Sequence, residues 1–203
     1  MQYQTLTIGR EFGCGSGDFG RALAGKLGWK LFDRELIDEV ARAAQFDPAA
    51  CRQADERVEH WLHRIGKGLW SAAGEKGPAT VPVSGPDADL MAHWTARVIE
   101  DLAAAGSCIL VGRGGNHILR GHPDAFHVFL YAPFAWRLRR LEAQGMDRPA
   151  AEALLHRMDH DRAAYIRHYF QQEWPDRHGY HLLLNASLGP DALLAATLAA
   201  MQG

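Results

Sequence analysis

Five short apolar runs punctuate the chain, and each is bounded by glycine, proline or charged residues. Their length and composition are typical of buried β-strands. Longer segments separate them, in which apolar residues recur every three or four positions, as they do on one face of a helix. Because strands that alternate with helices form parallel sheets, the pattern predicts an α/β domain with a doubly wound, parallel, five-stranded sheet. The predicted strands are residues 6–9, 29–32, 108–111, 126–131 and 180–185.

Proline, glycine and acidic residues mark the ends of the predicted helices. The helix expected from residue 87 carries Leu90, Trp94, Val98 and Leu102 on one face and stops at Gly106. Residues 66–86 lack helical spacing and are rich in Gly, Pro, Ala and Ser, so we expect a long loop there. Other helices are expected to begin near residues 18, 35, 47, 133, 149 and 190.

Composition narrows the class of protein. The chain has 203 residues and a formal net charge of −2, which fits one domain with a smaller insert and argues against general nucleic-acid binding or membrane-surface binding. Its cysteines, Cys14, Cys51 and Cys108, lack metal-site spacing and indicate reduced thiols. The histidines form no paired metal motif, so we expect no protein-held metal. Neither a signal peptide nor a membrane-spanning apolar run is present, and we therefore expect a cytoplasmic protein. The oligomeric state is left open.

The first predicted strand leads into a glycine-rich turn, residues 13–20. Glycines leave no Cβ in the way, so backbone N–H groups can converge on an anion at the positive end of the following helix. Three interpretations stay open. The turn is a modified kinase P-loop, a dinucleotide-binding loop, or a structural turn without a ligand. Residues 15–20 read G-x-G-x-x-G, and the acidic Asp33 follows the next strand, as a dinucleotide site requires.

Spacing favours the P-loop, because residues 10–14 separate the strand from that fingerprint. The P-loop is not a standard one. Ser16 stands where the usual lysine would be, and Gly17 stands where a Mg²⁺-binding Ser or Thr would be. We expect ATP phosphates to bind the backbone of Gly13, Cys14, Gly15, Ser16, Gly17 and Asp18.

Three of the predicted strands end in arginine, namely at Arg10, Arg34 and Arg113. Ligands of doubly wound sheets bind beyond the carboxyl ends of the strands, which lie along one edge. Guanidinium groups match the oxygens of phosphate. The three arginines therefore predict a site for a polyanion.

Three blocks of the sequence resemble the cytidylate kinase-like family. They are residues 8–17, residues 110–119, and residues 159–165 followed by 173–174 and 184–187. The resemblance covers nearly the whole chain outside residues 46–86. It implies a P-loop NTPase-like domain over residues 1–203, with an acceptor-binding helical insert at 34–105 and a lid-like helical segment at 146–178.

The resemblance also implies an activity, which is phosphoryl transfer from ATP to a nucleoside monophosphate, with CMP or dCMP expected first. In this interpretation Arg113 holds the acceptor phosphate, while Arg157 and Arg162 close over the transferred group. Arg10 is a candidate for the positive charge of the missing lysine.

Cofactors and partners follow from the same interpretation. The expected cofactors are ATP and Mg²⁺, with the ion bound mainly by the phosphates and by water. Asp33 and Arg34 are expected to bind the substrate, with Asp33 contacting the acceptor sugar or a water-held Mg²⁺. The expected partners are nucleotides. The alternative function is a nucleotide-sensing or regulatory protein on a kinase fold, which binds nucleotide without turnover.

Overall fold

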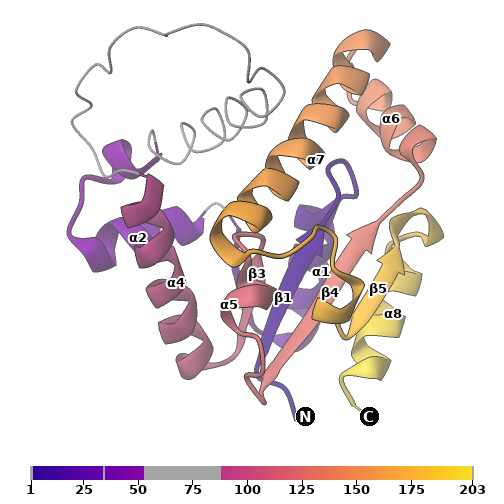
Figure 1. The fold of residues 1–203 in the computed structure, drawn as a ribbon. Coiled ribbons are helices and arrows are strands. Elements are labelled where there is room, and N and C mark those ends of the chain that lie inside the picture. The colour runs from indigo at the N-terminus through magenta and orange to yellow at the C-terminus, as the bar shows by residue number, and fades with distance from the viewer. Residues whose placement is uncertain (1, 34, 53–87, 203) are drawn as a thin grey trace, which may run out of the picture.

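The computed structural model describes residues 2–33, 35–52 and 88–202 (Figure 1). Its centre is a parallel sheet of five strands in the order β2-β3-β1-β4-β5. The central strand β1 (Thr5–Arg10) pairs with β3 (Cys108–Val111) and β4 (Ala125–Tyr131). The edge strands are β2 (Lys30–Phe32) and β5 (Leu182–Asn185). The doubly wound α/β sheet predicted from the sequence is confirmed.

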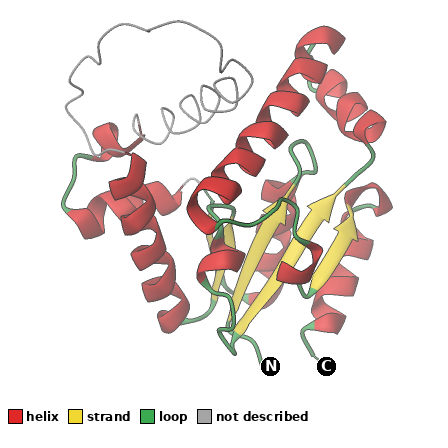
Figure 2. Cartoon of the chain, in the orientation of Figure 1, coloured by secondary structure: helices red, strands yellow, loops and turns green. Residues whose placement is uncertain are grey.

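Helices cover both faces of this sheet (Figure 2). No helix among the described residues is long and apolar enough to cross a membrane. The predicted loop at 66–86, and the predicted helix from residue 47 beyond residue 52, lie outside the described residues. Residues 48–52 are helical, as predicted for the helix from residue 47. The other described helices are α1 (Ser16–Leu27), α2 (Glu35–Ala44), α4 (Ala88–Ala105), α5 (Gly115–Ile118), α6 (Phe134–Ala143), α7 (Arg148–Phe170) and α8 (Pro190–Ala200), with 3₁₀ turns η1 (Arg177–Gly179) and η2 (Ala186–Leu188).

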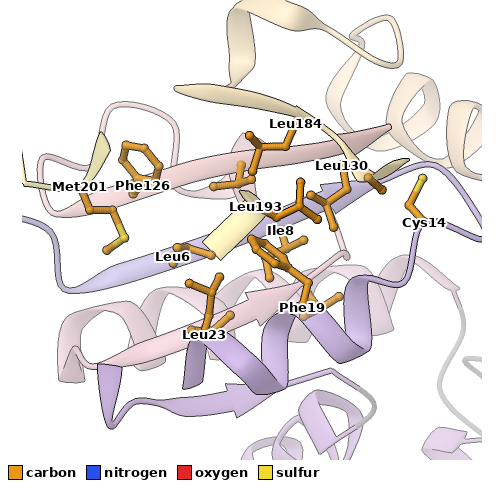
Figure 3. Close-up of a cluster of buried hydrophobic side chains, with 14 of the residues drawn as sticks. Leu6, Ile8, Cys14, Phe19, Leu23, Phe126, Leu130, Leu184, Leu193 and Met201 are labelled. Carbon is orange, nitrogen blue, oxygen red and sulfur yellow. The ribbon is translucent and has the colours of Figure 1, made fainter. Parts of the chain in front are cut away.

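Two buried clusters lie on opposite faces of the sheet, because successive side chains of a strand point to opposite sides. On one face Leu6 and Ile8 of β1 pack with Leu23 of α1 and Leu193 of α8 (Figure 3). On the other face, Leu110 of β3 packs in a cluster that also contains buried residues of α2 and α4. The described parts of the predicted insert at 34–105 thus cover the main sheet.

The predicted apolar face of α4 is confirmed in part, because Val98 is buried whereas Leu90 is exposed. Leu90 is 39% exposed, whereas Met91, Thr95 and Ile99 are buried. Trp94 and Leu102 are only partly buried against the same cluster. Apolar residues occupy two adjacent stripes of this helix, so periodicity alone does not fix where the centre of the buried face lies. Packing against α2 and the sheet buries Val98 together with Met91 and Ile99, so the buried face is centred between the two stripes.

A small polar cluster lies within the apolar sheet. His127 of β4 is 6% exposed, and its Nδ1 lies 2.8 Å from Oγ1 of Thr7. The backbone N–H of His127 donates to Nδ1 of His181 at 2.9 Å. Burial lowers the pKa of His127 to about 4. The folded protein therefore holds this imidazole in its neutral form.

We expect the protein to lose stability as the pH falls from about 6.5 to about 4. In this range His127 binds a proton in the unfolded chain but stays neutral in the folded chain. The difference between the two pKa values corresponds to a loss of about 3 kcal/mol in the free energy of unfolding. Denaturant unfolding at several pH values measures the loss. His127→Gln should flatten the slope, leaving only the contributions of other groups. An unchanged slope in this variant would show that His127 does not carry the effect.

Candidate active site

The glycine loop, residues 13–18, has the backbone geometry of an anion-binding turn. Gly13 and Gly15 adopt left-handed conformations, with φ of 83° and 76°, and Gly15 caps α1. The first helical hydrogen bond runs from Phe19 N–H to the Gly15 carbonyl oxygen at 3.1 Å. The amides of residues 16–18 precede this bond and project from the positive end of the helix. The backbone here fits phosphate oxygens, as P-loops do.

A second feature, the strand-end pocket, opens at the carboxyl ends of β1 and β3. The centre of a water molecule can reach about 120 Å³ of it, well above the roughly 10–15 Å³ that one water needs. Arg10, Arg113 and Arg162 line the pocket together. Asn116 also lines it and is 6% exposed, and its Nδ2 has no hydrogen-bond partner among the described residues. The pocket thus offers both positive charge and a buried neutral donor.

The turn after β3 holds Arg113 in an unusual backbone conformation. Gly112, Arg113 and Gly114 are all left-handed, with φ of 80°, 56° and 70°. This conformation costs a residue with a Cβ roughly 1–2 kcal/mol. A Cβ on Gly112 would overlap the guanidinium of Arg10, and one on Gly114 would overlap the ring of Phe170. The two glycines therefore let a side chain from β1 and one from α7 pack directly on this turn.

A buried arginine that the sequence analysis did not single out connects the glycine loop to α7. Arg137 of α6 is 6% exposed. Its Nη1 donates to Asp159 Oδ2 at 2.5 Å and to the Phe12 carbonyl oxygen at 3.1 Å, and its Nε lies 3.4 Å from Glu11 Oε2. Asp159 Oδ1 in turn accepts from Phe12 N–H at 2.7 Å. We call Arg137, Glu11 and Asp159 the Arg137 network.

Arg162 extends this connection to the strand-end pocket. It lies one helical turn after Asp159, with Nη1 at 3.7 Å from Asp159 Oδ1 and at 3.4 Å from the Arg10 carbonyl oxygen. Its guanidinium also lies over the ring of Phe12, at 5.4 Å from the ring centroid. Arg162 thus contacts the chain between β1 and the glycine loop from the side of α7.

The thiol of Cys14 lies in the core rather than at the loop surface. Cys14 is 4% exposed, and its side chain belongs to the buried cluster of Figure 3. Burial, reinforced by the Glu11 carboxylate, raises the pKa of the thiol to about 12. The thiol is therefore protonated at neutral pH and contributes no nucleophile. Any contact of Cys14 with phosphate comes from its backbone.

The other predicted site residues are spread more widely. Asp33 lies beside the glycine loop, with Oδ2 at 3.7 Å from the position that a Cβ on Gly17 would take. Asp18 pairs with Arg21 and Arg140. Arg157 is exposed on α7 and is not among the described residues that line the strand-end pocket. Arg34 lies outside the described residues.

The donor groups near the loop suit a Mg²⁺ ion that keeps most of its waters. Within residues 2–33, 35–52 and 88–202, no three His, Cys, Asp or Glu side chains cluster as metal ligands. Gly17 offers no hydroxyl, whereas the carboxylate of Asp33 lies close by. Mg²⁺ commonly binds through one or two carboxylates, phosphates and water. The carboxylate of Asp33 therefore has the chemistry and the place to hold a water of such an ion.

The parallel sheet and the glycine loop after its central strand define the class of P-loop NTPase-like folds. In dinucleotide-binding sheets β2 lies next to β1, whereas here β3 does, so the dinucleotide interpretation is not supported. Residues 5–188 match the cytidylate kinase-like family, and the chain belongs to that family. Kinase-like phosphoryl transfer is the activity that the family supports. A search of curated proteins gave no match.

Solved structures with the same fold include three of similar extent. An uncharacterized protein from Eubacterium ventriosum ATCC 27560 is 19% identical with a TM-score of 0.67, over 98% of this chain and 99% of that chain. A gluconokinase from Sinorhizobium meliloti 1021 is 14% identical, with a TM-score of 0.55, over 99% of this chain and 93% of that chain. A shikimate kinase from Bacteroides thetaiotaomicron is 12% identical, with a TM-score of 0.52, over 98% of this chain and 99% of that chain. At these identities the likeness shows the fold.

Proposed function

We propose that the protein transfers the γ-phosphoryl group of ATP to a nucleoside monophosphate, with CMP or dCMP as the first candidates. One observation carries the proposal. The glycine loop and the strand-end pocket lie at the same end of β1. Only residues 11 and 12 separate Arg10, which lines the pocket, from the glycine loop. A donor phosphate chain on the loop would meet an acceptor phosphate in the pocket. An acceptor oxygen would then bond to the γ-phosphorus as the bond to the β–γ bridging oxygen breaks.

This reaction needs positioning and charge neutralisation rather than a covalent intermediate. The backbone of residues 13–18 would hold the ATP phosphates. Arg113 would hold the acceptor phosphate, with Arg10 and Arg162 nearer to the transferred group. Asp33 would hold a water of the Mg²⁺ ion, because its position beside Gly17 favours this role over contact with the acceptor sugar. Arg157 would reach the site only if α7 or its side chain moved.

A regulatory protein that binds nucleotide without transfer is the second candidate. The observation that favours it is the loop itself, in which Ser16 and Gly17 provide neither the lysine nor the hydroxyl of a standard P-loop. The three arginines in one pocket favour the enzyme.

A turnover assay separates the two candidates. The full chain is incubated with ATP, Mg²⁺ and each of a panel of nucleoside monophosphates, and ADP release is followed in parallel with ATP binding by calorimetry. Transfer to CMP or dCMP above the ATPase background is the expected result. ATP binding without transfer to any monophosphate would favour the regulatory protein, and failure to bind ATP would contradict both.

Arg113→Ala is expected to weaken use of the acceptor by about ten- to hundredfold, because a charge-assisted contact to phosphate is lost. ATP affinity should change little, since the donor phosphates bind the other loop. Arg113→Lys should restore only part of the loss, because a lysine lacks the forked geometry. Acceptor KM, ATP affinity and melting temperature are measured for each variant.

Arg120→Ala provides the control, because Arg120 is exposed just beyond α5. It should behave as the wild type in all three measurements. If Arg113→Ala instead lowers the melting temperature and weakens both substrates equally, Arg113 is a structural strut and the acceptor assignment is wrong.

A further inference from the structure

The glycine loop of this chain lacks the lysine of a standard P-loop, and the fold brings the guanidinium group of an arginine on α6 to the same loop. Arg140 of α6 lies directly on Gly15, the residue that caps α1. Its Nη2 and Cζ are 3.0 Å and 3.2 Å from the position that a Cβ on Gly15 would take. In a standard P-loop the lysine directly follows the corresponding glycine. The guanidinium of Arg140 therefore lies beside the place where that lysine begins.

Arg140 is held in this position from two sides. Its Nη2 donates to Asp18 Oδ2 at 2.8 Å, and its guanidinium lies 6.0 Å from the centroid of the Trp136 ring. Arg21 binds the other oxygen of Asp18, at 2.6 Å from Oδ1. The side chain of Arg140 is 33% exposed, compared with 66% for Arg21. Arg140 is thus the more buried of the two cations, yet it still reaches solvent at the mouth of the loop.

We propose that Arg140 binds the phosphate chain of the nucleotide at the glycine loop and supplies the charge that lysine supplies in a standard P-loop. Asp18 acts as a positioning residue, because its carboxylate holds the guanidinium over Gly15 and shares it with the arriving phosphate. This inference rests on the proposed function for the location of the phosphates. It also separates the duties of two arginines, since Arg10 lies across Gly112 in the strand-end pocket rather than over the loop.

The charges of the cluster support this assignment. Arg140 and Arg21 share the carboxylate of Asp18, and the second carboxylate, Asp33, lies on the Gly17 side of the loop, where Arg21 also lies. On the Gly15 side the guanidinium of Arg140 is the charged group beside the cap of α1, and an ATP phosphate chain would meet it next to the projecting amides. A planar guanidinium matches two phosphate oxygens at once, which a single ammonium group does not.

Calorimetric titration of the full chain with ATP, and separately with inorganic triphosphate, tests the proposal. Arg140→Gln removes the charge while keeping most of the side-chain length, and it should weaken both ligands by about ten- to hundredfold. Arg140→Lys should recover part of the affinity. Arg139→Ala is the matched control, because Arg139 is the exposed neighbour in the same helix, and it should bind both ligands as the wild type does.

The outcomes distinguish this inference from the proposed function. If the wild type binds ATP and a folded Arg140→Gln variant binds ATP and triphosphate equally well, Arg140 is only a strut for Asp18 and the inference is overturned, while the proposed function stands. If the wild type binds neither ligand, both are overturned. Thermal melting shows whether each variant is folded, and should Arg140→Gln be unfolded, the same comparison is made between Arg140→Lys and the wild type.

Discussion

Replacing Arg137 by alanine is expected to lower the free energy of unfolding by about 3–5 kcal/mol, because two partly buried carboxylates would lose their shared positive partner. The side chain of Arg137 is 8% exposed, and those of Glu11 and Asp159 are 23% and 20% exposed. Phosphoryl transfer should also be abolished, since Phe12, next to the glycine loop, would lose the hydrogen bond from Arg137. Denaturant unfolding and the turnover assay measure the two effects.

Arg139→Ala serves as the control here too, because it removes an arginine from the same helix on the exposed side. Arg137→Lys should remain destabilised, since one ammonium group cannot reproduce bonds from Nε and Nη1 to separate acceptors. If Arg137→Ala unfolds with the same midpoint and slope as the wild type, the Arg137 network does not stabilise the fold.

The second large effect is expected at Arg10. Arg10→Ala should reduce turnover by about a hundred- to a thousandfold, with a smaller effect on ATP affinity, because charge at the transferred group is greatest in the transition state. The kcat and the ATP affinity are measured separately. Full activity in this variant would show that another residue carries the role.

Gly112→Ala tests the same arginine without removing it. The added Cβ would overlap the guanidinium of Arg10 and should displace it, so the variant should lose turnover as Arg10→Ala does. Gly121→Ala is the matched control, because Gly121 has a similar φ of 79° but no atom within 4 Å of the added Cβ. If Gly121→Ala loses as much activity, backbone strain rather than the position of Arg10 explains the result.

The sheet could be predicted from the sequence because strands buried on both faces leave continuous apolar runs. Residues 108–111 are an example, since all four side chains are buried. The predicted grouping of Arg10 and Arg113 followed from the rule that parallel strands present their carboxyl ends at one edge. The structure places both, together with Arg162, around one pocket.

The rest of the site depends on contacts between residues far apart in the sequence. In the sequence, Arg137 is one of several charged residues on a predicted amphipathic helix. Only the fold shows that Glu11 and Asp159 lie beside it. The positions of Glu11 before the glycine loop and of Asp159 in the third family block were the available signals. Arg140 reaches Asp18 across 122 positions, for which local patterns carry no information. The stripe of α4 was likewise decided by its neighbours.

One element, α7, touches both halves of the proposed site. Asp159 holds Phe12 next to the glycine loop, Arg162 contacts Arg10, and Phe170 packs on Gly114 beside Arg113. A shift of this 23-residue helix would therefore change the shape of both phosphate sites together. If such a shift accompanies binding at one site, the coupling is reciprocal, because whatever factor a bound nucleotide applies to acceptor affinity, the bound acceptor must apply to nucleotide affinity. The helix would then act as the mechanical element through which occupancy of one site is communicated to the other.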